Sequence, residues 1–241
     1  MARLYHIFAH KWCGRIKVLM DTIKLRNVTK KFKLKSGEVS ALTNINLDIV
    51  AGDFVAIRGE SGSGKSTLLQ IMSGLDVPSS GEVVVENQNL SKMKDKQLAK
   101  FRSEVFGFVF QSFYLHPLLT MRQNIELPAC FSGMSDEKRA IRTKELVDFL
   151  GMGELIDRLP TELSGGQCQR AAILRAIYNQ PKIMFADEPT GNLDLKSSNQ
   201  VLDLLKRVNE RLGITVILAT HDTNMSEAAR RIINIDHGEI I

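Results

Sequence analysis

A glycine-rich stretch at residues 59–67 has the residue types and the spacing that bind a chain of phosphates. Glycines let the backbone curl until successive amides point at one anion, and a helix that begins there adds its positive end. Lys65 is expected to reach the β- and γ-phosphates, the Ser66 hydroxyl to bind magnesium, and Thr67 to hold the α-phosphate. The predicted nucleotide-binding residues of this stretch are Gly59, Ser61, Gly62, Ser63, Gly64, Lys65, Ser66 and Thr67.

Two adjacent acids, Asp187 and Glu188, follow an apolar run at residues 183–186 that predicts a buried strand. The ends of strands in such sheets lie beside the phosphate-binding loop. We expect Asp187 to hold magnesium, directly or through water. The side chain of Glu188 points differently, and we expect it to polarise the attacking water, a role worth ~10²–10⁴ in rate. The pair predicts hydrolysis of a nucleoside triphosphate.

Three further residues are candidates for contact with the nucleotide. Gln111 follows the strand-like run 107–110, and its amide could coordinate the metal and sense the γ-phosphate. His221 follows the run 214–219, and a neutral imidazole can donate one hydrogen bond to a γ-phosphate oxygen or to the attacking water. Phe32 could stack on the base. The alternatives are a solvated loop amide, a structural histidine and an apolar edge residue.

The segments around these residues follow an α/β order. An apolar run at residues 54–57 leads into the glycine-rich stretch, and Leu68, Leu69, Ile71 and Met72 mark the buried face of a helix that Gly74 closes. A strand, a glycine-rich loop and a helix form the context that a phosphate-binding loop requires. Further helices and strands are expected at residues 23–28, 39–50, 82–85, 201–212 and 214–219.

Between residues 92 and 163 the pattern changes to charged, helix-favouring stretches. Ser135, Asp136 and Glu137 place a cap and acids at the start of one helix, and Gly151 ends it. We therefore expect residues 92–163 to form a helical lobe inserted into the nucleotide-binding core.

A further motif at residues 163–167, Leu-Ser-Gly-Gly-Gln, has no role within a single nucleotide site. With it, the chain from residue 21 onward resembles the ATP-binding subunits of ABC transporters. The segments 108–111, 115–120, 124–128 and 187–194 resemble more narrowly the LolD/MacB branch, whose members drive lipoprotein release, macrolide or peptide efflux, or related envelope tasks. The residues that carry the family resemblance, in order, are Phe32, Gly59 to Thr67, Gln111, Leu163 to Gln167, Asp187, Glu188, Asp194 and His221.

The resemblance implies an α/β fold with a RecA-like P-loop core, an N-terminal antiparallel β subdomain and an inserted α-helical subdomain. It places the core and β subdomain at residues 21–91 and 164–241, and the helical subdomain at 92–163. The family usually has Tyr where this chain has Phe32, so stacking survives and a hydroxyl is lost.

The resemblance also implies ATP and Mg2+ as cofactors and a homodimer that encloses two ATP molecules. Ser164, Gly165, Gly166 and Gln167 would act on the ATP of the opposite subunit, and Asp194 would couple the two sites. Small residues at the start of a helix leave its amides free to face an anion. This is a physical reason for residues 164–167 to act on the ATP of the opposite subunit. ATP binding would then close the dimer and hydrolysis would open it.

The function implied is that of an ATPase subunit that drives a separate membrane permease. An alternative is a regulatory ATPase like the cell-division protein FtsE, which controls an envelope complex and transports nothing. A DNA-repair or ribosome-associated protein is disfavoured because the chain lacks a long coiled-coil insertion and a second nucleotide domain. A phosphoryl-transfer kinase would leave residues 163–167 unexplained.

The apolar segment from Phe113 to Leu119 directly follows the expected phosphate sensor. We expect it to line a groove that receives an amphipathic helix of the permease, a common mode of recognition. The alternative is that it belongs to the core of the helical lobe.

The composition, 44% hydrophobic and 24% charged over 241 residues, is that of an ordinary globular protein. No apolar run reaches the ~18 residues that a membrane span needs, so we expect another polypeptide to carry the spans. Cys13, Cys130 and Cys168 lack disulfide or metal spacing, which fits a reducing compartment. The expected location is the cytoplasmic face of the inner or plasma membrane.

Residues 1–20 form a basic N-terminal extension that holds Arg3, Lys11, Arg15 and Lys17 and no acid. The net charge of the whole chain is +5, so the remainder has a net charge of only +1 and no nucleic-acid-binding face is expected. Aromatic residues among the basic ones would let the extension lie on an anionic membrane surface. A frayed extension without such a contact is the alternative.

Overall fold

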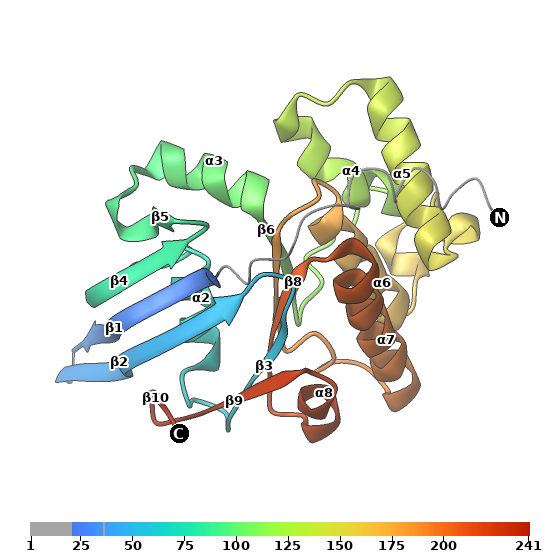
Figure 1. The fold of residues 1–241 in the computed structure, drawn as a ribbon. Coiled ribbons are helices and arrows are strands. Elements are labelled where there is room, and N and C mark those ends of the chain that lie inside the picture. The colour runs from blue at the N-terminus through green and yellow to red at the C-terminus, as the bar shows by residue number, and fades with distance from the viewer. Residues whose placement is uncertain (1–20, 36) are drawn as a thin grey trace.

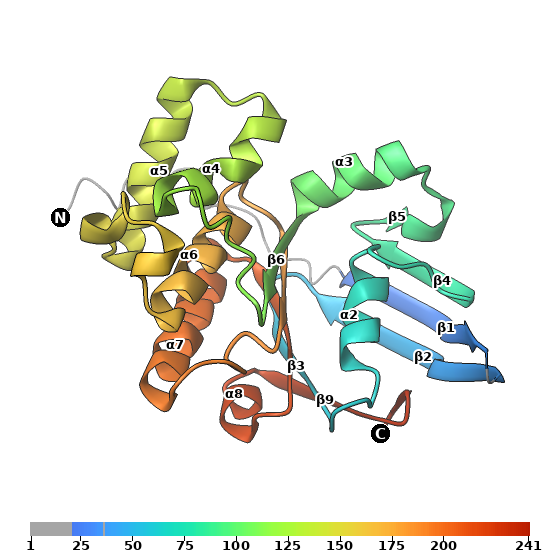
Figure 2. The same ribbon diagram turned by 180° about the vertical axis from the view of Figure 1, so that it is seen from behind.

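In the computed structural model of the chain, residues 21–35 and 37–241 are described (Figure 1). Two sheets lie side by side, and helices lie on both faces of the larger one (Figures 1 and 2). The basic extension at residues 1–20 lies outside the described residues, so the expectations for it stay predictions. Among the described residues, no helix combines the length and the apolar character that crossing a membrane requires.

The larger sheet has six strands and forms the nucleotide-binding core. All of its strands are parallel except the edge strand β10, which is antiparallel to β9. Its inner strands read as short apolar runs because helices cover both faces, as is typical of buried parallel sheets. Every residue of β8 is buried, as are four of the five in β3 and in β7. In order across the sheet, the strands are β10 (Glu239–Ile240), β9 (Arg231–Asp236), β3 (Phe54–Arg58), β8 (Thr215–Thr220), β7 (Ile183–Asp187) and β6 (Phe106–Phe110).

The smaller sheet has four antiparallel strands, and α2 lies between it and the larger sheet (Figure 2). One apolar cluster joins the inner face of this sheet, the buried face of α2 and one face of the larger sheet. This packing fixes α2, whose first turn carries Lys65, relative to both sheets. The elements are β2 (Gly37–Val50), β1 (Asp21–Leu34), β4 (Ser80–Val85), β5 (Gln88–Asn89) and α2 (Lys65–Met72).

Helices on the opposite face of the larger sheet enclose a second apolar cluster (Figure 1). The helix α6 lies at its centre and packs against α4, α7 and β6. The helices of the chain after α2 are η1 (Leu90–Lys92), α3 (Asp95–Val105), α4 (Met121–Ser132), α5 (Asp136–Leu150), η2 (Gly153–Leu155), η3 (Pro160–Glu162), α6 (Gly165–Ile177), α7 (Leu195–Leu212) and α8 (Thr223–Glu227).

The predicted fold class is confirmed, and so is the expected end of a helix at Gly151. Gly151 and Gly213 follow α5 and α7 in the left-handed conformation that glycine adopts without strain. The prediction for α7 was too short, because the helix begins at Leu195 rather than at residue 201. Its first turn lacks apolar periodicity and is set instead by Asp194, whose carboxylate accepts a hydrogen bond from the Ser197 amide at 2.9 Å.

The predicted boundary of the helical lobe at residue 92 is wrong. Strand β6 lies within the predicted lobe but pairs with β7 in the larger sheet. Helix α3 is charged on its exposed side, yet it buries Phe101 and Val105 in the first apolar cluster. The described structure therefore keeps residues 95–110 with the core, and the helices of the lobe follow β6.

Candidate active site

The phosphate-binding loop joins the end of β3 to the start of α2, as the sequence predicts. Gly62 and Gly64 have φ angles of 82° and 107°, in the left-handed region that favours glycine. A Cβ on Gly59 would lie 2.2 Å from the carbonyl oxygen of Ile235, and a Cβ on Gly64 would lie 2.7 Å from that of Ala41. Only glycine fits these positions, because strands from both sheets press on the loop.

Lys65 is 6% exposed, and its ammonium group donates to the loop carbonyls of Gly59 and Glu60 at 2.9 and 2.8 Å. It lies 3.8 Å from the carboxylate of Glu188. The hydroxyl of Ser63 is buried in the same loop with no hydrogen-bond partner among the described residues. A buried cation and an unpaired buried hydroxyl beside a helix N-terminus fit a phosphate group, which would satisfy both.

The first turn of α2 meets the end of β7 at the expected metal position. Ser66 Oγ donates to Asp187 Oδ1 over 3.1 Å. Burial raises the pKa of Asp187, and the nearby Glu188 carboxylate raises it further, while Ser66 and Lys65 act in the opposite direction. No group of three or more His, Cys, Asp or Glu able to hold a metal occurs in the described part of the chain. One hydroxyl and one carboxylate nevertheless fit Mg2+, which in nucleotide sites takes its other ligands from phosphates and water.

Glu188, the next residue, contacts a different set of side chains from Asp187. Its Oε1 lies 2.9 Å from Nδ1 of His221, and its Oε2 accepts a hydrogen bond from the Thr220 hydroxyl at 3.3 Å. The parallel pairing of β7 with β8 creates this cluster, because it sets Asp187 opposite Ala219. Glu188 has a φ of 45°, uncommon for a residue other than glycine, and its amide donates to the carbonyl of Ala219 at 2.9 Å. No feature of the sequence indicated a role for Thr220.

Gln111 follows β6, but it bonds to neither carboxylate in the described residues. Its Nε2 donates to Asn192 Oδ1 at 3.2 Å, and Asn192 Nδ2 donates back to the carbonyl of Gln111 at 3.3 Å. A Cβ on Gly191 would lie 2.8 Å from Nε2 of Gln111. A glycine at this position therefore lets the Gln111 side chain lie against the backbone at residue 191. Gln111 is thereby tied to the segment that follows Glu188. Sequence reasoning missed the role of Asn192.

Ser164 and Gln167 form a reciprocal capping box at the start of α6. The Ser164 hydroxyl accepts from the Gln167 amide at 3.3 Å, and Gln167 Oε1 accepts from the Ser164 amide at 2.8 Å. Gly166 is buried, and a Cβ on it would lie 2.7 Å from the Ser197 hydroxyl. The glycines Gly165 and Gly166 therefore place the start of α6 against the start of α7. No hydrogen bond joins residues 164–167 to Lys65, Asp187 or Glu188 within the described ranges.

Two predicted site residues lie apart from this cluster. Asp194 caps α7, and hydrogen bonds from the Ser197 amide and hydroxyl lower the pKa of Asp194. Phe32 is 39% exposed on β1, and the ammonium group of Lys30 lies 4.9 Å from the centre of its ring. A partly exposed aromatic ring of this kind can stack on a base.

The comparisons with known proteins agree with this geometry. The model of the ABC transporter family matches residues 42–191. The chain is 47% identical over 225 residues to an uncharacterized ABC transporter ATP-binding protein, MJ0796 of Methanocaldococcus jannaschii, covering 90% of this chain and 94% of that protein. It is 43% identical over 223 residues to the macrolide export ATP-binding/permease protein MacB of Syntrophobacter fumaroxidans, covering 92% of this chain but 31% of that protein.

Among solved structures, a dimeric post-hydrolysis state of the MJ0796 cassette bound to ADP and Pi matches with a TM-score of 0.83 and 44% identity. This match covers 90% of the present chain and 96% of that one.

The loop, the strand-end carboxylates and the two-sheet fold together define an ATPase of the P-loop class. The chain belongs to the ABC transporter family, as an ATP-binding and ATP-hydrolysing subunit. The predicted family, the LolD/MacB-like branch and the ATPase activity are therefore confirmed. The roles of individual site residues stay predictions.

Replacing Asp187 by Asn separates the cost of burying this carboxylate from its use in binding metal. Because the pKa of Asp187 is raised in the folded chain, its ionised form destabilises the nucleotide-free protein at neutral pH. Asp187→Asn should therefore raise the melting temperature at pH 7, and raise it less as the pH falls toward the usual aspartate pKa of about 3.9. Mg2+-dependent ATP hydrolysis should fall by ~10² or more.

The control is Asp203→Asn, at an exposed position on α7. It should change neither the melting temperature nor the rate of ATP hydrolysis. A melting temperature for Asp187→Asn at pH 7 equal to or below that of the unmodified chain would contradict the account of Asp187.

Proposed function

We propose that this chain works as a homodimer that encloses two Mg-ATP and drives a separate export-type permease from the cytoplasmic face of a membrane. The observation that carries the hydrolytic part is the position of Glu188. Its carboxylate lies at a strand end, 2.9 Å from His221 and 3.8 Å from the buried Lys65 ammonium. A carboxylate held between a histidine and the phosphate-binding lysine is placed to activate water beside a γ-phosphate.

The other residues of the site would bind and orient the nucleotide. Lys65 would exchange its bonds to loop carbonyls for bonds to the β- and γ-phosphates. Ser66 and Asp187 would hold Mg2+, which supplies the positive charge that draws electrons from the phosphates when bound. His221 would donate to a γ-phosphate oxygen, and Phe32 would stack on adenine.

The dimer follows from where the remaining donors lie. The first turn of α6, with Gly165 and Gly166, makes no bond to the phosphate-binding loop of its own chain among the described residues, although helix N-termini bind anions well. In a second copy these amides would meet the terminal phosphate held by Lys65. The MJ0796 structure, a dimer bound to ADP and Pi, supports a dimer for the present chain.

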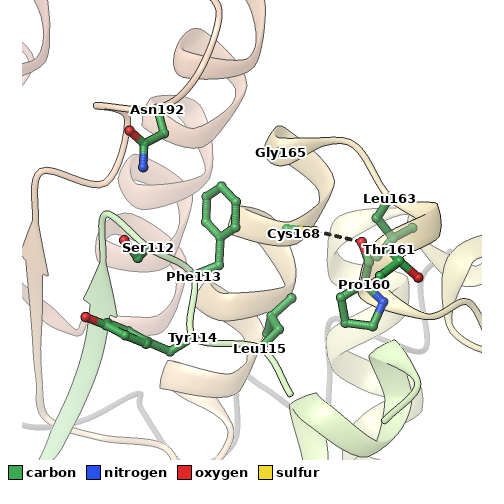
Figure 3. Close-up of a pocket in the computed structure, with 10 residues that line it drawn as sticks. All are labelled: Ser112, Phe113, Tyr114, Leu115, Pro160, Thr161, Leu163, Gly165, Cys168 and Asn192. Atoms are coloured by element: carbon green, nitrogen blue, oxygen red, sulfur yellow. Dashed lines mark hydrogen bonds between the residues drawn. The ribbon is translucent and has the colours of Figure 1, made fainter. Parts of the chain in front are cut away.

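A pocket of about 600 Å³ beside the start of α6 is the proposed docking site for the permease (Figure 3). Figure 3 shows Phe113 and Leu115 pointing toward α6 from the irregular segment after β6, with Cys168 opposite. Of the run from Phe113 to Leu119 that was predicted to line a groove, only the first three residues line this pocket. Leu118, later in the run, is 80% exposed. The docking pocket is lined by Ser112, Phe113, Tyr114, Leu115, Pro160, Thr161, Leu163, Gly165, Cys168 and Asn192.

The relatives support a transporter rather than a regulatory ATPase. Three of them are described as macrolide export ATP-binding/permease proteins, and the present chain covers only 31% to 34% of their lengths. In those proteins the ATP-binding part is joined to a permease. We infer that this chain likewise works with a permease, which holds the ATPase at the membrane.

Replacing Glu188 by Gln should keep ATP binding, lower turnover by ~10²–10⁴, and trap a dimer in saturating Mg-ATP. Light scattering would measure the dimer, and release of phosphate would measure turnover. Lys65→Ala is the matched comparison, because it should weaken ATP binding itself. A monomeric Glu188→Gln variant under these conditions, both alone and with its permease, would contradict the proposal.

Removing the aromatic rings of Phe113 and Tyr114 together, by substitution with Ala, should uncouple the ATPase from its permease. Basal hydrolysis should stay within about 2-fold of the unmodified chain, while stimulation by the permease should disappear. The control is Phe131→Ala, which removes an aromatic ring 87% exposed on α4. Loss of ATP binding in the double variant would favour a role for these rings in the core of the lobe.

A further inference from the structure

The irregular segment between β6 and α4 is held by polar side chains from two helices. Asn124 of α4 is fully buried, and its Oδ1 accepts from the amide of His116 at 2.7 Å. Its Nδ2 donates to the carbonyls of His116, Leu119 and Thr120 at 2.9 to 3.1 Å. This end of the segment is therefore fixed to α4.

Helix α6 holds the middle of the same segment. The guanidinium of Arg175 donates to the carbonyls of Phe113 and Tyr114 at 2.8 and 2.5 Å. Both residues line the docking pocket. A shift of the segment therefore acts on α6 through Arg175.

Gln169, one turn into α6, connects this helix to the active site. Its side chain is fully buried, and Nε2 donates to the carbonyl of Phe110 at 3.2 Å and to the carbonyl of Pro189 at 2.6 Å. Its Oε1 is buried with no hydrogen-bond partner among the described residues. Leaving a buried acceptor unpaired has a cost, so the role of this side chain lies in its two donated bonds.

The two acceptors identify that role. Phe110 immediately precedes Gln111, and Pro189 immediately follows Glu188. The side-chain amide of Gln169 therefore bonds one residue away from Gln111 and one residue away from Glu188. These are the two residues expected to sense and to hydrolyse the γ-phosphate. The bonds are to main-chain carbonyls, so they act on backbone position and leave the side chains of Gln111 and Glu188 free.

We propose that Gln169 is a positioning residue for ATP hydrolysis, which ties the backbone at Gln111 and Glu188 to α6. The proposal rests on the roles given above to those two residues. A rotation or translation of α6 can start at the docking pocket or at the motif of residues 163–167. Either movement shifts the carbonyls of Phe110 and Pro189 together through this one side chain. Gln169 makes no contact with nucleotide in this arrangement; its effect is on geometry.

The test replaces Gln169 by Met, which keeps the length and volume of the side chain and removes both donors. Basal hydrolysis by the full chain should show kcat lowered about 10-fold, with KM for ATP within about 2-fold, because the bonds matter for the reacting geometry rather than for binding. The matched control is Asn209→Leu. Asn209 is likewise a buried amide on a helix, donating to the carbonyls of Gly52, Asp53 and Ile214 at 2.8 to 3.1 Å, but at the far end of α7. Its loss should lower the melting temperature without lowering kcat of the folded protein.

A double-mutant cycle with Gln111→Ala separates positioning from general destabilisation. If Gln169 acts through Gln111, the double variant should lose much less activity than the product of the two single losses. If Gln169→Met leaves kcat unchanged, or if the two losses multiply, the proposal is overturned. Should Gln169→Met not fold, Gln169→Glu keeps the shape of the side chain and is judged by the same kcat and the same cycle.

The outcome for Glu188→Gln distinguishes failure of this proposal from failure of the proposed function. Normal turnover in Glu188→Gln would overturn the catalytic assignment itself. An inactive Glu188→Gln variant together with an unaffected Gln169→Met variant would overturn only the role of Gln169.

Discussion

Neutralising the charge of a triphosphate is the constraint on which the rest of this structure depends. The described site sets one buried ammonium group, that of Lys65, beside the carboxylates of Asp187 and Glu188. Phosphates added to this cluster would be repelled by the acids, so magnesium and backbone amides have to balance them. The glycines of the loop supply amides on one side of the phosphates. Among the described residues, the amides at the start of α6 make no bond to this loop, and this is the physical reason for proposing a second copy.

Helix α6 is the element that relates this site to the rest of the molecule. It begins with the glycines proposed to face the other copy's nucleotide, and Gly165 and Cys168 line the docking pocket. Its Arg175 holds the pocket's backbone, and its Gln169 holds the backbone beside Gln111 and Glu188. This helix contributes buried apolar residues to the second apolar cluster and is tightly packed there. In the proposed arrangement, chemistry at the phosphate and movement at the pocket are linked through this helix.

The sequence predicts those parts of the site that are encoded locally. Glycines at positions 62 and 64 indicate the curled loop directly, because few other residues adopt their φ angles. Apolar runs followed by acids predict the end of β7 equally well. The positions of Thr220, Asn192 and Gln169 were not predicted, because each bonds to a group that only the pairing of β6, β7 and β8 brings near. The sequence also misplaced the start of the helical lobe, since the charges on α3 conceal the two apolar residues that it buries in the core.

The most direct test is a crystal structure of the Glu188→Gln variant with Mg-ATP. The account predicts that the amides of Gly165 and Gly166 of one chain lie within hydrogen-bond distance of the terminal phosphate held by Lys65 of another. If every assembly in the crystal leaves these amides far from any terminal phosphate, the account of how the site is completed is contradicted.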